Sequence, residues 1–434
     1  MNLIRTRVLT FVGAATALGF LVAGVSGQTR PMCDPDNGGL TLPPGFCALV
    51  VAENLGPARH IVAAPNGDLY VALMTSGGRG QAPTGGGAVV LRDANGDGRF
   101  EMKEPFGSGS TTGIALRNGY VYLAHPTTIE RIKLTAGQLK PTGAVETIVT
   151  GLPNDRQHED KGIAFDGTGS LYINVGAPSN ACQDPDRRPG VKGVDPCPIL
   201  EKHGGIWKFD ENKMGQTQEQ GTRFATGLRQ MPAITWQGGA LYIVMHNRDQ
   251  LDTFWPKNFT AKDNAERPAE GLYRATQGSD FGWPYCFFDY TTKKLVLNPE
   301  YGGDGTEVGR CTKFTQPIVA YPAHWAPVDI KFYTGTQFPA KYRNGAFIAF
   351  HGSWNRSPLP QAGYNITFQP FSGGKPSGAW EVFADGFAGQ SSLENPNAAV
   401  ARPDGIAQAP DGSLYIGESQ KGKIWRVIYT DAKK

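Results

Sequence analysis

One hairpin pattern recurs six times along the chain and constrains its fold more than any other feature. Each copy has a short apolar strand, a turn containing glycine or asparagine, and a second strand with an aromatic residue. The NG, DG and GG dipeptides supply the positive φ that tight hairpins require. Because one hairpin cannot bury both of its faces, several copies must pack around a common axis. The pattern predicts an all-β fold, a six-bladed β-propeller with four-stranded antiparallel blades.

The spacing of the copies leaves room for outer strands and for insertions around residues 177–204 and 250–320. A series of unrelated hairpins is the alternative, and six matching copies disfavour it. The copies are IVAAPNGDLYVAL (61–73), GIALRNGYVYLAH (113–125), GIAFDGTGSLYINVG (162–176), AITWQGGALYIVMH (233–246), DIKFYTG with RNGAFIAFHG (329–352) and GIAQAPDGSLYIGES (405–419).

Composition agrees with a turn-rich β protein. The chain has 57 glycines and 32 prolines, and only 19% of its residues are charged. Loss of Arg5 and Arg7 with an export signal would lower the net charge from +3 to +1. No run of five basic residues occurs, so nucleic acid is not expected as a partner.

The first residues are typical of an export signal. Arg5 and Arg7 precede an uncharged apolar stretch that ends in small residues suited to cleavage before Gln28. The sequence predicts a signal peptide at 1–27, an N-terminal segment at 28–45 and a catalytic propeller at 46–430. The alternative is an uncleaved membrane anchor. No later stretch is apolar enough to span a membrane, so we expect a periplasmic or secreted protein without stable membrane insertion after cleavage.

Six cysteines fit an oxidising compartment. They form three locally spaced pairs, and although 15 connectivities are possible, pairing between neighbours is the simplest. Without CxxC or CxxCH, neither a zinc site nor a covalently attached haem is expected. The predicted pairs are Cys33–Cys47, Cys182–Cys197 and Cys286–Cys311.

The hairpins also predict where a site lies. In each hairpin, the residues before the first strand and after the second lie at the same end, so the copies should meet at one mouth of the channel. His158, Arg229, Trp325 and Arg402 precede first strands. Second strands end in the segments His246-Asn247-Arg248-Asp249 and His351-Gly352-Ser353-Trp354-Asn355-Arg356. Arginines, a histidine and tryptophans around one pocket favour a planar, polyanionic ligand.

Seven strings in these positions resemble the soluble quinoprotein sugar dehydrogenase family, including its sorbosone and aldose dehydrogenase-like branches. They occur in family order and cover roughly residues 45–430. The strings are RQHEDKGIAFDGTGSLYINVG, ATGLRQMPAITW, LYIVMHNRDQLD, GSDFGWPYC, HWAPVDIKFYTG, FIAFHGSWNR and RPDGIAQAPDGSLYIGES.

The resemblance implies oxidation of a sugar or related aldehyde by pyrroloquinoline quinone, with electrons passed to an external acceptor such as a quinone or cytochrome. His158 would be the base that takes the hydroxyl proton, a role that suits an imidazole of nearly ordinary pKa. Arg229 would stabilise charge on the quinone oxygens. Further implied cofactor contacts are Lys161, Trp325, Trp354, Asn355, Arg356 and Arg402, and the implied calcium site is Asn247, Arg248 and Asp249, partly through backbone carbonyls.

The chain departs from the family pattern at several of these positions. Gln230 stands where asparagine is common, and Lys161 stands near the place of an arginine. His-Asn-Arg-Asp replaces the Gly-Pro of the glucose-oxidising branch. These differences argue against simple transfer of glucose specificity.

Residues 93–104 offer a second candidate for calcium. DANGDGRFEMKE fits the calcium-loop pattern with Asp93, Asn95, Asp97, Gly98 and Glu104. A strand-like AVVLR precedes it where that motif has a helix, so a polar hairpin turn is the alternative. If calcium binds there, its role should be structural.

Two other functions remain open at this stage. Six-bladed propellers also support calcium-dependent hydrolysis, as in a sugar lactonase, but that site needs several carboxylates around the channel. A non-catalytic propeller that binds glycan or protein needs none of the mouth residues and leaves them unexplained.

Overall fold

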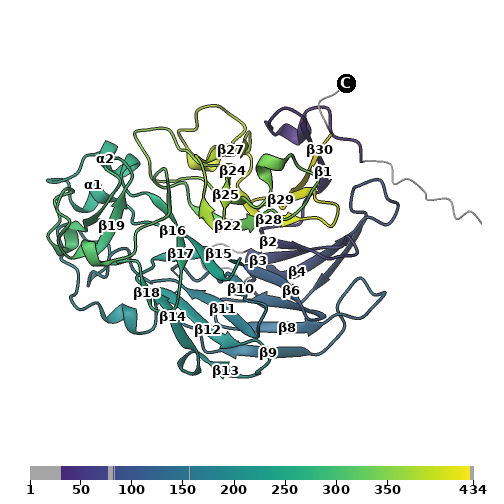
Figure 1. Ribbon diagram of the computed structural model, residues 1–434, viewed down its shortest axis with the longest axis horizontal. Coiled ribbons are helices and arrows are strands. Elements are labelled where there is room, and N and C mark those ends of the chain that lie inside the picture. The colour runs from purple at the N-terminus through teal and green to yellow at the C-terminus, as the bar shows by residue number, and fades with distance from the viewer. Residues whose placement is uncertain (1–30, 77–81, 83, 156, 431–434) are drawn as a thin grey trace, which may run out of the picture.

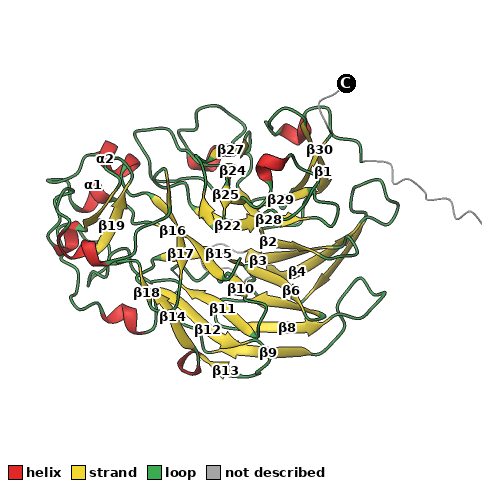
Figure 2. Cartoon of the chain, viewed as in Figure 1, coloured by secondary structure: helices red, strands yellow, loops and turns green. Residues whose placement is uncertain are grey.

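The computed structural model describes residues 31–76, 82, 84–155 and 157–430. Figures 1 and 2 show strands grouped into sheets that fan around a centre, with very little helix. The six-bladed, all-β propeller predicted from the hairpins is confirmed. The predicted signal peptide at 1–27 lies outside the described residues.

Each blade is a four-stranded antiparallel sheet, numbered from the channel outward. Blade 1 contains β2 (Ala58–Ala63), β3 (Leu69–Ser76), β4 (Thr84–Arg92) and β5 (Met102–Phe106). Blade 2 contains β6 (Gly113–Arg117), β7 (Tyr120–Ala124), β8 (Ile129–Lys133) and β9 (Val145–Thr150). Blade 3 contains β10 (Ile163–Phe165), β11 (Ser170–Val175), β12 (Gly205–Asp210) and β14 (Thr222–Thr226).

Blade 4 contains β15 (Gln230–Gln237), β16 (Ala240–His246), β17 (Glu270–Ala275) and β21 (Val319–Tyr321). Blade 5 contains β22 (Pro327–Phe332), β23 (Ala346–Phe350), β24 (Asn365–Gln369) and β27 (Glu381–Ala384). Blade 6 contains β28 (Pro403–Gln408), β29 (Leu414–Glu418), β30 (Ile424–Tyr429) and β1 (Phe46–Ala52). Short parallel strands β13 (Gln216–Thr217) and β18 (Ser279–Asp280) extend blades 2 and 3.

Pairing between the two ends of the propeller closes the ring. β1 lies antiparallel to β30, with Phe46 opposite Tyr429, so the first strand is the outer strand of the last blade. Each innermost strand contacts the innermost strands of both neighbouring blades. After closure, every innermost strand therefore has a neighbouring blade on both sides.

The hydrophobic core lies between the blades. One cluster joins Ile61 and Leu69 of blade 1 to Ala407 and Tyr415 of blade 6. Alternation along each strand sends side chains to both faces of a blade, and both faces are covered by neighbouring blades. The repeated aromatic residues are all buried here: Tyr70, Tyr122, Tyr172, Tyr242, Phe347 and Tyr415.

Both predicted insertions are present, and each contains a disulfide of its own. Helices α1 (Leu251–Phe254) and α2 (Ala261–Glu266), with the hairpin β19 (Cys286–Asp289) and β20 (Lys294–Leu297), lie at one side of the propeller (Figure 1). A small hairpin, β25 (Phe371–Ser372) and β26 (Lys375–Pro376), extends blade 5. The three predicted disulfides, Cys33–Cys47, Cys182–Cys197 and Cys286–Cys311, are confirmed.

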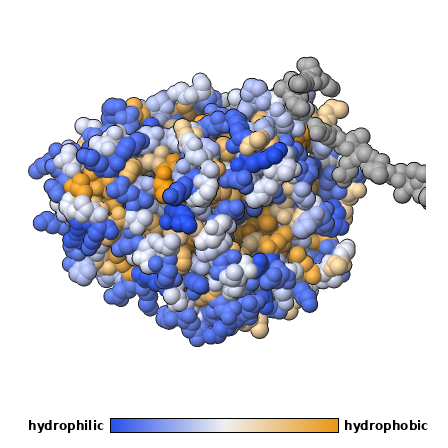
Figure 3. All heavy atoms as spheres, in the orientation of Figure 1, coloured by the Kyte–Doolittle hydropathy of each residue, from blue (hydrophilic) through white to orange (hydrophobic). Residues whose placement is uncertain are grey.

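Hydrophilic residues predominate on the face seen in Figure 3, with smaller hydrophobic groups between them. Among the described residues, no helix has the length and apolar character needed to cross a bilayer.

Candidate active site

A cavity of about 340 Å³ opens where first strands begin and second strands end. It brings together residues that are far apart in sequence because each blade contributes its strand ends to the same opening. The predicted residues that line it are His158, Arg229, Asn247, Asp249, Trp354, Asn355 and Arg402. The other lining side chains used below are Arg59, Asp160, Gln230, His246, Glu270, His324 and His351.

Four predicted residues lie behind the cavity wall. Lys161 is buried and donates to the Glu159 carbonyl at 2.6 Å, and burial lowers its pKa to about 8. The fully buried Arg248 pairs with Glu300. Trp325 packs edge-to-face on Phe350, with ring centroids 5.4 Å apart. Arg356 donates to the Ala323 carbonyl at 3.1 Å and to the Ala265 carbonyl.

His158 is fixed in one tautomer. Its Nδ1 lies 2.5 Å from the Ala177 carbonyl oxygen, which can only accept, so Nδ1 carries the proton and Nε2 keeps its lone pair. Burial, and next the charge of Arg229, lower its pKa from 6.5 to about 3. This differs from the nearly ordinary pKa expected from the sequence. The ring is therefore a neutral proton acceptor at pH 7 with a weak affinity for the proton.

Gly176 keeps His158 in place by having no side chain. A Cβ there would lie 2.4 Å from the His158 carbonyl oxygen and 2.5 Å from Gln230 Oε1. Real Cβ atoms do not approach other atoms so closely, so the main chain around His158 requires glycine at this position.

Arg229 and Asp249 form the charged centre of the wall. Arg229 Nη2 lies 2.5 Å from Asp249 Oδ2, and Nη1 donates to the Asn247 carbonyl at 2.8 Å. Asp249 Oδ2 also pairs with Arg187 at 3.2 Å, and Asn355 Nδ2 donates to Oδ1 at 2.9 Å. Burial opposes ionisation of Asp249, but the charge of Arg229 holds its pKa well below the usual range.

The cavity contains four of the seven histidines in the chain. His246 Nε2 donates to the Pro327 carbonyl at 2.6 Å, and His324 Nε2 donates to the Asn264 carbonyl at 2.6 Å. Burial lowers the pKa of both rings, in His246 to about 4. The pKa of His351 is also lowered by burial, and then by nearby arginines. The histidines are therefore neutral at pH 7.

A second arginine–carboxylate group lies in the wall. Arg59 pairs with Asp404 at 2.7 Å and approaches Asp160 at 4.0 Å. Glu270 differs, because burial raises its pKa to about 8 although the Asn247 and Ala326 N–H groups donate to it. At pH 7 the residues that line the cavity therefore carry three positive charges and two negative ones, and Asp404, which does not line the cavity, offsets the charge of Arg59.

Sequence reasoning missed Arg59, Glu270 and His324 as wall residues. His246 and His351 occupy equivalent places at the ends of second strands, so the repeat itself was a signal for both. Arg59 lies inside β2, only two residues before Ile61, whereas His158 and Arg229 lie five residues before Ile163 and Ile234, so the offset used for the other copies does not reach it.

Three buried polar atoms near the cavity have no hydrogen-bonding partner among the described residues: Arg229 Nε, Gln230 Oε1 and Asn355 Oδ1. Unpaired buried polar atoms are costly, so this wall suits a polar ligand. The side chains of residues 247–249 are poorly suited to bind a cation. Asn247 Oδ1 accepts from the Arg248 N–H, and both Asp249 oxygens are engaged, with two arginines adjacent.

The 93–104 loop lies away from the cavity. Asp93, Asp97 and Glu101 place one oxygen each within 4.8 Å of one another. The third carboxylate is Glu101, whereas the predicted Glu104 lies in β5, opposite Val90 of β4. Asn95 Nδ2 donates to Asp97 at 3.2 Å.

Sequence comparisons identify fungal relatives. The chain is 26% identical over 274 residues to a pyrroloquinoline quinone-dependent pyranose dehydrogenase of Coprinopsis cinerea, covering 54% of this chain and 36% of that protein. It is 25% identical over 247 residues to a pyrroloquinoline quinone-dependent sugar dehydrogenase of Hypocrea jecorina, covering 52% and 53%. The matches thus span about a third to a half of these relatives.

Solved structures share the fold. The quinone domain of the Coprinopsis cinerea pyranose dehydrogenase, in its holo form, superposes with a TM-score of 0.68 at 18% identity, covering 90% of this chain and 97% of that one. A calcium structure of a Trichoderma reesei protein of carbohydrate-active family AA12 gives 0.71 at 18% identity, covering 93% and 99%. The TrAA12-like family model matches residues 40–430. The chain therefore belongs to the TrAA12-like family, which confirms the predicted resemblance to quinoprotein sugar dehydrogenases.

Proposed function

We propose that this protein oxidises a sugar with pyrroloquinoline quinone bound in the cavity and passes the electrons to an external acceptor. The observation that carries the proposal is the convergence of Arg59, Arg229 and Arg402 with the neutral His158 on one cavity. The quinone is a planar, tricyclic tricarboxylate. Such a ligand suits a wall with excess positive charge and unpaired polar atoms.

When bound, the quinone supplies a two-electron acceptor. The wall would bind it through the charges of Arg59 and Arg402, which also hold Asp404 and main-chain carbonyls, and through Arg229 Nε, which has no hydrogen-bonding partner among the described residues. Trp354 lines the cavity and its indole is 54% exposed, so it can cover a bound ring while still contacting solvent. The fungal relatives, which are named for this quinone, support the assignment.

His158 is the proposed base. Its Nε2 accepts the proton of a substrate hydroxyl, while the Ala177 carbonyl keeps Nδ1 protonated and the ring oriented. With the charges of the chain alone, the pKa of His158 is about 3, which makes it a weak base. The carboxylates of a bound ligand would oppose the field of Arg229 and raise that pKa toward the working range.

Calcium is proposed as the second cofactor, supported by the calcium structure of the Trichoderma reesei protein. The side chains of Asn247, Arg248 and Asp249 are already engaged within the protein and are not the ligands we propose for it. The carboxylates of Asp93, Asp97 and Glu101 offer a separate structural site in the loop for which the sequence leaves a plain hairpin turn as the alternative.

The cavity disfavours a lactonase, because Asp160 and Asp249 lie beside arginines and the pKa of Glu270 is raised. A pyranose or related aldehyde is the proposed substrate class, and a quinone or cytochrome is the proposed acceptor. The disulfides support export to the periplasm or the medium.

The test titrates purified protein with the quinone and calcium, follows binding by absorbance after dialysis, and assays dye reduction against a panel of sugars. His158→Gln should lower kcat by about 10²- to 10⁴-fold without changing quinone affinity. His203→Gln is the matched control, since His203 pairs with Asp155 outside the cavity. A wild-type protein that binds no quinone overturns the proposal, and unchanged turnover of His158→Gln removes it as the base.

A further inference from the structure

The loop after β11 contacts three of the residues that line the cavity. Its second residue, Ala177, accepts from His158 Nδ1 at 2.5 Å and donates its N–H to the Arg229 carbonyl at 2.7 Å. Asn180 then binds the main chain of Asp249 twice. The Asp249 N–H donates to Asn180 Oδ1 at 2.9 Å, and Asn180 Nδ2 donates to the Asp249 carbonyl at 2.9 Å. One short segment thus ties a blade 3 histidine to two residues of blade 4.

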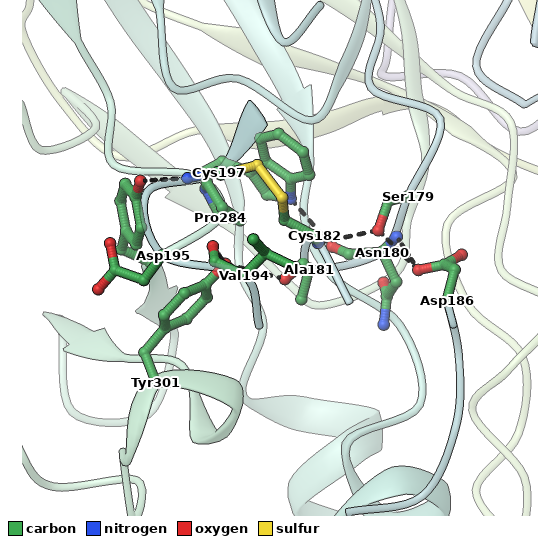
Figure 4. Close-up of a disulfide and its surroundings, with 12 residues drawn as sticks. Ser179, Asn180, Ala181, Cys182, Asp186, Val194, Asp195, Cys197, Pro284 and Tyr301 are labelled. Carbon is green, nitrogen blue, oxygen red and sulfur yellow. Dashed lines mark hydrogen bonds between the residues drawn. A yellow bond between two sulfur atoms is a disulfide. The ribbon is translucent and has the colours of Figure 1, made fainter. Parts of the chain in front are cut away.

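Asn180 is itself firmly held and fully buried. Its N–H donates to Asp186 Oδ1 at 3.1 Å, and its carbonyl accepts from the Trp283 indole at 2.9 Å. Ser179 Oγ donates to the same Asp186 oxygen at 2.6 Å and accepts from the Cys182 N–H at 2.8 Å. Figure 4 shows this cluster beside the Cys182–Cys197 disulfide, which closes the rest of the loop.

Asp249 depends on this support because no strand holds it. It lies three residues beyond the end of β16, in a segment without regular structure. Its carboxylate nevertheless bonds Arg229 Nη2 at 2.5 Å and Asn355 Nδ2 at 2.9 Å, and both partners line the cavity. In a buried network, a displaced acceptor leaves its donors unpaired, so the position of the Asp249 main chain determines where both partners lie.

The geometry points to Asn180 as a positioning residue that clamps the Asp249 main chain and so fixes Arg229 and Asn355 for the quinone. Asn180 does not line the cavity and acts only through Asp249. This inference rests on the proposed function, because the quinone is the ligand whose affinity the clamp would set.

The chain offers a matched control for the loss of such a clamp. Gln216 is buried and binds the main chain of Asp210 in the same way, with the Asp210 N–H donating to Oε1 at 3.2 Å and Nε2 donating to the Asp210 carbonyl at 2.8 Å. It lies in β13 at the outer edge of blade 2 and does not line the cavity.

The experiment is a double-mutant cycle of Asn180→Ala and Asp249→Asn, read by the Kd for pyrroloquinoline quinone and by the urea midpoint. Asn180→Ala should raise the Kd by roughly 10- to 100-fold, as is typical when a partner that supports a site residue is removed. In the Asp249→Asn background, Asn180→Ala should raise the Kd by less than about 2-fold, since the two residues act as one unit. Gln216→Ala should lower the urea midpoint and leave the Kd unchanged. If Asn180→Ala does not fold, Asn180→Asp keeps the oxygen that accepts from the Asp249 N–H and removes the Nδ2 donor to the Asp249 carbonyl, and it should raise the Kd in the same direction.

Equal effects of Asn180→Ala with and without the Asp249 carboxylate would overturn the inference, as would an equal loss of affinity in Gln216→Ala. If the wild type binds no quinone, the proposed function fails, and the urea midpoints still decide whether Asn180 acts through Asp249. In that case coupling between positions 180 and 249, with additivity between 216 and 249, supports the clamp, and additivity in both pairs refutes it.

Discussion

Replacement of Asp249 by asparagine tests the electrostatic account of the cavity directly. The change keeps the shape of the side chain and removes the charge that balances Arg229, whose side chain is only 3% exposed and lies 2.5 Å away. Removing one partner of a buried ion pair costs about 3–5 kcal/mol, because the other charge stays buried without compensation. Arg229 keeps its bond to the Asn247 carbonyl, and Arg187 is 26% exposed, so we expect a loss near the lower limit, about 3 kcal/mol.

Urea unfolding followed by tryptophan fluorescence measures this loss. Because the pKa of Asp249 is depressed in the fold, its contribution is fully present above the unfolded value of 3.8 and is lost as pH falls below it. The part of the difference that comes from the titration of Asp249 itself should therefore be constant from about pH 5 to 8, and a change near pH 8 reports Glu270, whose pKa burial raises and Asp249 raises further.

Glu381→Gln is the control, since its ion pair with Lys341 is exposed and should contribute less than about 1 kcal/mol. A buried pair is weakly screened, so added salt should affect the Asp249 difference little. A loss below about 1 kcal/mol for Asp249→Asn, or one that disappears in about 0.5 M NaCl, would refute the reasoning.

Four further predictions follow from the same structure. The fold holds His246 neutral with a pKa of about 4, so His246 alone should lower the unfolding free energy by about 3 kcal/mol as pH drops from 6.5 to 4. Urea melts of His246→Gln should therefore show a shallower pH dependence than those of the wild type. Gly176→Ala should displace His158 and lower kcat by at least about 10-fold in steady-state assays, whereas an unchanged kcat contradicts the close approach. Calcium should raise the melting temperature of the wild type and not of Asp97→Asn, and an equal response in both excludes the loop. Cys286→Ser should cost about 2–5 kcal/mol in denaturation, and equal stability would show that the insertion holds without its disulfide.

The sequence alone determined the architecture, because the six hairpins carry their own turn signals and alternate apolar residues in each copy. It also determined that His158, Arg229 and Asn355 would meet, because strand ends in a propeller gather at one mouth. The disulfides followed from local spacing. These features depend on the order of residues along the chain. In a repeating fold, the place of a residue within its repeat predicts its place in the structure.

Only the tertiary structure decided which way each side chain at the mouth points. Arg248 and Asp249 are adjacent in sequence, yet one pairs with Glu300 behind the wall and the other faces the cavity. The insertion that carries Glu300 determines the direction of the Arg248 side chain, and the repeats do not predict this contact. Burial likewise sets the low pKa of His158 and the raised pKa of Glu270, because desolvation depends on how the whole fold excludes water from each group.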